Sequence, residues 1–176
     1  MFIRIKKIKN IEYAYLVKSI WKKKTARQKV VKYLGRIHVL KQTTTMPFDE
    51  FCQKFSINID ENTDYKQIIQ YLFEWTVYQY NFKKDPLIQK KWLFDHGKII
   101  ADPEKLRIYT KKRELTLKIN DGYMNSYTLK ELLKIKLNKN TEEQRQAATM
   151  LANAFVNAGI NIPRDIFINI FQKVYI

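Results

Sequence analysis

Five carboxylates gather in one stretch of the sequence and could together hold a metal ion. These residues are Asp95, Asp102, Glu104, Glu114 and Asp121. Carboxylate oxygens are the ligands that Mg²⁺ prefers, and a nuclease uses such an ion to activate water. A metal-dependent nuclease is therefore one hypothesis for this chain. Solvation of loops and strand ends explains the same residues without a metal.

Other side chains with catalytic potential are scarce. The chain has two histidines, His38 and His96, and one cysteine, Cys52. Asp95 precedes His96, but neighbours in a strand point to opposite faces, so adjacency does not make a catalytic pair. Cys52 falls on the apolar side of an expected helix, and four scattered glycines cannot build a phosphate loop. We therefore predict a protein that is not an enzyme, with no catalytic residue, no metal ligand and no cofactor.

Cations dominate the composition, and most of their excess lies near the N-terminus. The chain has 33 Lys and Arg against 17 Asp and Glu, a net charge of +16 over 176 residues. Residues 1–42 hold 13 bases and one acid, Glu12, whereas residues 43–82 carry a net charge of −4 and residues 140–176 carry none. A module with this concentration of cations is typical of a protein that binds a polyanion.

The elements that must position these cations are three β-strands. Apolar and polar side chains alternate over residues 2–8, 12–21 and 27–37, which predicts an antiparallel meander with a polar hairpin loop at residues 22–25. The period of two assigns one apolar face to Ala14, Leu16, Ile20, Val30 and Leu34. It assigns the other face to Arg4, Lys6, Tyr13, Tyr15, Ser19, Trp21, Arg27, Lys29 and Tyr33.

A sheet face that combines cations with aromatic rings suits a nucleic acid. Cations neutralise phosphates, and bases stack on rings with about 1–3 kcal/mol each. On duplex DNA the alternative geometry is a two-stranded ribbon in the major groove. A competing interpretation covers the tyrosines with the aromatic helix 64–82, leaving the lysines to solvate the rim. The predicted contacts with nucleic acid are Arg4, Lys6, Tyr13, Tyr15, Lys22, Lys23, Lys24, Arg27, Lys29 and Tyr33.

The rest of the chain predicts an α+β body. Helices are expected from Pro47 and over residues 64–82, short strands at 92–100, 106–110 and 114–119, and helices at 129–136, 142–158 and 164–175. Thr128 with Glu131 and Thr141 with Gln144 fit the capping-box pattern. The predicted fold class is α+β: an N-terminal three-stranded antiparallel basic β-meander (domain 1–42) and a body (43–176). That body has an aromatic-rich central helix, short strands and a C-terminal αα-hairpin.

The C-terminal helices raise a second functional hypothesis. Their cations are too few for a DNA recognition helix, and they carry the large apolar side chains Phe155, Phe167 and Phe171. These rings must be buried in the chain's own core or against a partner. The alternative is therefore a subunit or adaptor of a protein assembly, or a homo-oligomer, that binds through these helices.

The sequence predicts no contact with a membrane. No apolar run approaches the roughly 20 residues needed to cross a bilayer. Charges interrupt the apolar residues of Met1–Lys9, which differs from the continuous apolar stretch of a signal peptide. We therefore expect a cytoplasmic protein.

One segment resembles a known family. Tyr15-Leu16-Val17-Lys18-Ser19, a lysine-rich gap and then the run Arg27 to Gly35, which ends in Tyr-Leu-Gly, are similar to the N-terminal segment of IS1634/IS4-like transposases. In those proteins a basic strand pair precedes a DDE catalytic domain. The resemblance covers residues 1–37 and implies a module that contacts DNA. It does not imply transposition, since residues 43–176 contain no recognisable DDE triad and no catalytic residue is carried over.

Overall fold

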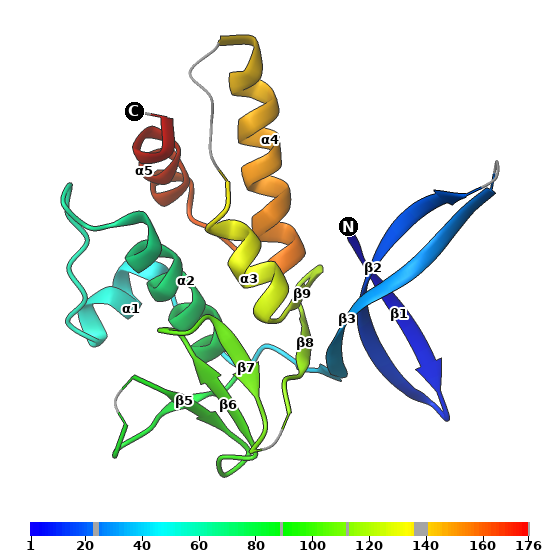
Figure 1. Ribbon diagram of the computed structural model, residues 1–176. Coiled ribbons are helices and arrows are strands. Elements are labelled where there is room, and N and C mark those ends of the chain that lie inside the picture. The colour runs from blue at the N-terminus through cyan, green and yellow to red at the C-terminus, as the bar shows by residue number, and fades with distance from the viewer. Residues whose placement is uncertain (23–24, 89, 112, 136–140, 176) are drawn as a thin grey trace.

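The computed structural model describes residues 1–22, 25–88, 90–111, 113–135 and 141–175, without the side chains of residues 22, 141–145, 174 and 175. The described residues form an α+β fold with two sheets (Figure 1). The helices are α1 (Phe48–Lys54), α2 (Tyr65–Gln79), α3 (Ser126–Leu132), α4 (Thr141–Ala158) and α5 (Arg164–Tyr175). No helix among the described residues has the length and apolar character needed to cross a bilayer. The predicted fold class is confirmed.

The larger sheet joins the N-terminal strands to the rest of the chain. Its strand order is β1-β2-β3-β8-β9, with β1 (Phe2–Ile8), β2 (Ile11–Lys22), β3 (Thr25–Val39), β8 (Thr116–Ile119) and β9 (Gly122–Met124). The meander β1 to β3 is antiparallel, as predicted, whereas β3 runs parallel to β8. In Figure 1 the far end of the β2–β3 hairpin extends away from the helices.

Strand β3 bulges twice against β2, at Leu34 and at Val31. Each of these residues lies between two paired residues of β3 and has no partner of its own on β2. A bulge of one residue exchanges the faces of the side chains beyond it, because side chains alternate with a period of two. Odd-numbered side chains of β3 before the bulge at Val31 therefore point to the opposite side of the sheet from Tyr33, which follows the bulge.

The apolar face of the meander packs onto the body. Ala14 and Leu16 are buried, as predicted, and Leu34 is buried although it is a bulge residue. They pack in one cluster with Tyr123 of β9 and Tyr127 of α3. The full cluster is Ile3, Ile5, Ala14, Leu16, Leu34, Ile37, Tyr123 and Tyr127.

A glycine permits the close approach of β3 to the body. Gly35 has a positive φ of 102°, which disfavours any residue with a Cβ. A Cβ at this position would also lie closer than 3.0 Å to backbone atoms of Glu114 and Leu115, which lead into β8. Gly35 therefore allows the chain before β8 to cross directly over β3.

The smaller sheet and the helices build the main core. This sheet has the order β4 (Lys83–Lys84), β5 (Trp92–Phe94), β6 (Ile99–Asp102) and β7 (Arg107–Tyr109), all antiparallel. Rings from α1, α2 and β5 meet in the core: Phe51 and Trp92 are buried, and Phe55 and Tyr78 pack against them.

Several local predictions are wrong. Residues 92–100 form a hairpin rather than one strand, because Asp95, His96 and Gly97 adopt positive φ values of 48°, 53° and 80° and make a turn. Pro47 occupies the position before α1 rather than its first turn. Thr128 is the third residue of α3, since Asn125 caps this helix and accepts hydrogen bonds from the backbone N–H groups of Tyr127 and Thr128 at 2.9 and 3.1 Å.

The two C-terminal helices agree closely with the predicted ranges 142–158 and 164–175. The helix pair α4 and α5 is present, with Gly159 at a positive φ of 70° after α4 and Pro163 directly before α5. The long helix predicted over residues 64–82 ends earlier, at Gln79, because Asn81 adopts a positive φ of 66°. The side chains of the predicted Thr141–Gln144 capping box lie outside the described residues.

Candidate nucleic-acid interface

The strand register gathers rings and cations on the outer face of the meander. Arg4 lies opposite Tyr15 and Lys6 opposite Tyr13 on the β1–β2 ladder, while β3 places Tyr33 opposite Tyr15 and Arg36 opposite Tyr13. We call this set the tyrosine face: Arg4, Lys6, Tyr13, Tyr15, Tyr33 and Arg36. Arg36 was missed in the sequence because the bulge at Leu34, which brings it to this face, leaves no pattern in a single strand.

In the tyrosine face, the ring of Tyr33 lies against the rings of both Tyr15 and Tyr13. The ring centroid of Tyr33 lies 5.3 Å from that of Tyr15 and 6.3 Å from that of Tyr13. The ammonium of Lys6 sits 5.3 Å from the Tyr15 centroid, within cation–π range. The residue Tyr33 is 43% exposed, so one ring of the cluster is open to a ligand.

The body adds a cation near the same face. Burial and the neighbouring Tyr15 and Tyr13 raise the pKa of Tyr33, and the positive charge of Arg113 partly opposes this rise. The guanidinium of Arg113 therefore acts on the tyrosine face from a loop 80 residues further along the chain, a proximity that no spacing in the sequence indicates.

Helix α2 does not cover the tyrosine face. Its buried side chains, Phe73 and Trp75 among them, belong to the main core, whereas the meander packs through a separate apolar cluster on its opposite face. The competing interpretation, in which the aromatic helix hides the tyrosines, is therefore wrong.

The predicted position of Arg27 and Lys29 also needs correction. Arg27 lies opposite Ile20 and Lys29 opposite Lys18, whereas the tyrosines share a face with the odd-numbered side chains of β2. Arg27 and Lys29 therefore point to the other side of the ribbon from Tyr33. The physical reason is the bulge at Val31, which exchanges the faces of β3. Val30 is displaced for the same reason and pairs with Val17 on the face of the tyrosines.

The distal hairpin forms an arm that is open to solvent on both faces. We define the arm as residues 18–22 and 25–31 of β2 and β3. Its described side chains are all exposed, and Trp21 is 77% exposed. The predicted contacts Lys23 and Lys24 lie outside the described residues, as does the side chain of Lys22.

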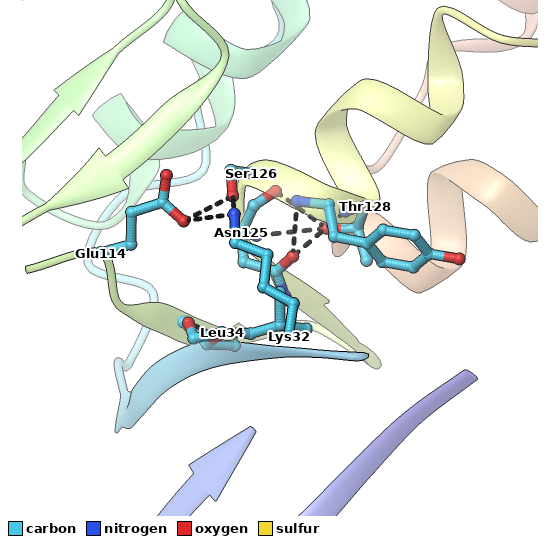
Figure 2. Close-up of polar contacts among 8 residues, drawn as sticks. Lys32, Leu34, Glu114, Asn125, Ser126 and Thr128 are labelled. Atoms are coloured by element: carbon cyan, nitrogen blue, oxygen red, sulfur yellow. Dashed lines mark hydrogen bonds and ion pairs between the residues drawn. The ribbon is translucent and has the colours of Figure 1, made fainter. Parts of the chain in front are cut away.

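Hydrogen bonds and an ion pair connect β3, at the base of the arm, to the body (Figure 2). Lys32 donates to Glu114 Oε2 at 2.9 Å, and Ser126 Oγ donates to the same oxygen at 2.9 Å. The hydroxyl of Thr116 donates to the backbone carbonyl of Leu34 at 2.9 Å. These contacts link β3 to Glu114 before β8, to the first residue of β8 and to the start of α3.

The carboxylate of Glu114 is stabilised in its ionised form. Burial raises the pKa of Glu114, but hydrogen bonds from Lys32 and Ser126 and the charges of Lys32 and Lys130 together bring it below its ordinary value. Lys32 is therefore neutralised within the protein, whereas Lys18, Arg27 and Lys29 of the arm take part in no ion pair among the described residues.

The carboxylates of the nuclease hypothesis are dispersed into separate contacts. Asp95 pairs with Lys98, Asp102 with Arg107, Glu104 with Lys90 and Glu114 with Lys32. Within the described part of the chain, no three His, Cys, Asp or Glu side chains come together in a group that could hold a metal ion. The nuclease hypothesis thus finds no ligand set among these residues.

The remaining reactive side chains also have structural surroundings. Burial, followed by the charge of Arg36, lowers the pKa of His38, which favours the neutral imidazole. His96 lies in the β5–β6 turn. Burial and the charge of Asp49 raise the pKa of the Cys52 thiol to about 11, so this thiol is a poor nucleophile.

The apolar faces of the C-terminal helices contact the chain's own core. Phe155 of α4 is 1% exposed and Ile170 of α5 is fully buried, while Phe167 and Phe171 are half-buried against the main core. Much of the surface that motivated the adaptor hypothesis is thus covered within one chain. The adaptor hypothesis stays a prediction without this support.

The comparisons with known proteins add no relationship. No family model matches the chain, and neither the search of curated proteins nor that of solved structures found a match. The resemblance of residues 1–37 to IS1634/IS4-like transposases therefore stays a prediction.

Proposed function

We propose that this protein binds nucleic acid, DNA in preference to RNA, through its N-terminal meander and without catalysis. The single observation that carries the proposal is an exposed basic meander whose one acid is Glu12. No Asp or Glu occurs between Glu12 and Asp49, and the meander exposes cations on its tyrosine face and, along the arm, on the opposite face. The transposase-like segment favours DNA.

The tyrosine face supports the proposal through its chemistry. Arg4, Lys6 and Arg36 supply cations to phosphates, and the exposed ring of Tyr33 supplies a flat surface for a base or a sugar. Each phosphate contact contributes about 0.9 to the slope of log K against log salt on duplex DNA. Three lost contacts should therefore lower the magnitude of this slope by about 3.

The test is a salt-titrated binding assay with a charge-matched control. Wild type is titrated with a mixed-sequence DNA duplex, single-stranded DNA and RNA, from about 50 to 200 mM salt. The tyrosine-face triple is Arg4→Gln, Lys6→Gln and Arg36→Gln. The body triple, with the same change in net charge, replaces three exposed lysines far along the chain: Lys66→Gln, Lys83→Gln and Lys105→Gln.

We expect the tyrosine-face triple to lose affinity and salt dependence, while the body triple behaves like wild type. Because the tyrosine face lies outside both apolar cores, circular dichroism should show the same fold for all three proteins. Absence of binding by wild type to every nucleic acid at about 50 mM salt, where such contacts are strong, would refute the proposed function.

A further inference from the structure

Beyond Val17 the meander continues as a two-stranded ribbon with unlike faces. Lys18, Arg27 and Lys29 share one face of the arm. Nearer the base of the meander, the same side of the sheet packs on the body through Ala14 and Leu16. The opposite face carries Trp21 and Gln28. The two faces therefore offer different chemistry: one presents the cations of the arm, and the other has no charged residue of its own among those described, although Arg4 of β1 donates to Gln28 Oε1 there at 2.7 Å.

Within the part of the chain that the structure describes, Lys18, Arg27 and Lys29 of this face have no acidic partner. None of the ion pairs among the described residues includes Lys18, Arg27 or Lys29. Lys18 and Lys29 lie directly opposite each other on the ladder, an arrangement that is destabilising for like charges. A two-stranded ribbon without a packed face is itself only marginally stable. An anion between these side chains would remove the repulsion and order the ribbon.

The dimensions of the arm favour B-form DNA over A-form RNA as its ligand. Five residue pairs, from Lys18–Lys29 to Lys22–Thr25, span about 13 Å at roughly 3.3 Å per residue. Neighbouring strands are about 4.8 Å apart, so a ribbon fits the major groove of B-form DNA, which is about 12 Å wide. The major groove of A-form RNA is too deep and narrow for side chains to read.

We propose that the arm enters the major groove of B-form DNA with its Lys18, Arg27 and Lys29 face toward the base edges and the flanking phosphates. This inference rests on the proposed function and assigns it a second contact surface, distinct from the tyrosine face. Trp21, on the other side of the ribbon, points out of the groove.

The first experiment compares the arm triple, Lys18→Gln, Arg27→Gln and Lys29→Gln, with the body triple of equal charge. With three contacts of about 0.9 each in the salt slope, the arm triple should bind a mixed-sequence duplex about 100-fold more weakly at ~0.15 M salt. The body triple should bind like wild type. The arm lies outside both apolar cores, so the arm triple keeps the fold needed for the comparison.

The second experiment identifies the groove. A duplex in which every cytosine carries a glucosylated 5-hydroxymethyl group has a filled major groove and unchanged phosphates, while netropsin fills the minor groove. On the glucosylated duplex, wild type should bind no better than the arm triple. With netropsin, the difference between the two proteins should persist.

Four outcomes separate this inference from the proposed function. Equal duplex binding by wild type and the arm triple, with loss in the tyrosine-face triple, overturns the inference and retains the function. An arm effect that netropsin removes overturns the major-groove assignment, as does an arm effect of equal size on single-stranded DNA or duplex RNA. No binding of any nucleic acid by wild type overturns the function and the inference together.

Discussion

Replacing Gly35 with alanine should loosen the meander from the body. A non-glycine residue in the left-handed region costs about 1–2 kcal/mol, and Gly35 has a φ of 102°. The new Cβ would also meet the backbone of Glu114 and Leu115, so the chain before β8 must move. Such overpacking costs about 1–3 kcal/mol, while reduced freedom of the unfolded chain returns about 0.4–1 kcal/mol. The expected net loss is about 1–5 kcal/mol.

The chain offers a matched control in Gly97. Gly97 has a φ of 80°, and a Cβ at this position would meet no atom within 4 Å. Gly97→Ala therefore adds the backbone strain without a contact between the new Cβ and other atoms. After the gain from reduced freedom of the unfolded chain is subtracted, it should lower the free energy of unfolding by about 1 kcal/mol or less. The difference between the two variants measures the steric contact between β3 and the segment before β8.

Urea unfolding followed by circular dichroism gives both free energies from the transition midpoints and slopes. We expect Gly35→Ala to be less stable than Gly97→Ala by about 2 kcal/mol, since only the former meets backbone atoms. Amide hydrogen exchange should show the additional opening at β3 and β8. Equal losses of stability in the two variants would refute the close approach at Gly35.

Three further predictions follow from buried or partnered side chains. Because the folded pKa of Glu114 lies below its ordinary value of 4.5, its ion pair contributes stability above that pH and loses it as the pH falls through the folded pKa. Urea midpoints at pH 7 and pH 3 should thus differ by less in Glu114→Gln than in wild type, an effect below about 1 kcal/mol. The pKa of about 11 for Cys52, against 9.0 for an ordinary thiol, predicts a thiolate fraction at pH 8 about 100-fold lower. Labelling by a chromogenic disulfide should be slow until urea unfolds the chain. Phe155→Ala should lower the free energy of unfolding by about 3–5 kcal/mol, because Phe155 is 1% exposed. The control Met150→Ala, at a residue 63% exposed, should lower it by less than about 0.5 kcal/mol in the same urea unfolding experiment. Equal losses would contradict the burial of Phe155.

The helical end of the chain was predictable because its signals are local. Gly159 and Pro163 bracket the connection between α4 and α5, and both act through their own backbone geometry. The turn at residues 95–98 was missed because the surrounding residues 92–100 are rich in β-favouring side chains. There, Gly97 and two residues that tolerate positive φ outweighed the strand propensity.

The candidate site was predictable in its composition but not in its geometry. Alternation placed Tyr13 and Tyr15 together, because β2 keeps a period of two along its length. It misplaced Arg27 and Lys29, because a bulge adds one residue to one strand and has no signature in that strand's own pattern. The effect of Arg113 on Tyr33 could not be predicted from the sequence, since it depends on the path of a loop far along the chain.

Charge and strand periodicity are properties of neighbouring residues, so the sequence alone predicts three basic N-terminal strands whose one acid is Glu12. The tertiary structure decided which cations are free. Glu114 neutralises Lys32, while Lys18, Arg27 and Lys29 extend past the body on one face of a ribbon. The ion pair of Lys32 and the crossing at Gly35 are contacts with a segment some 80 residues away, which local sequence patterns do not encode.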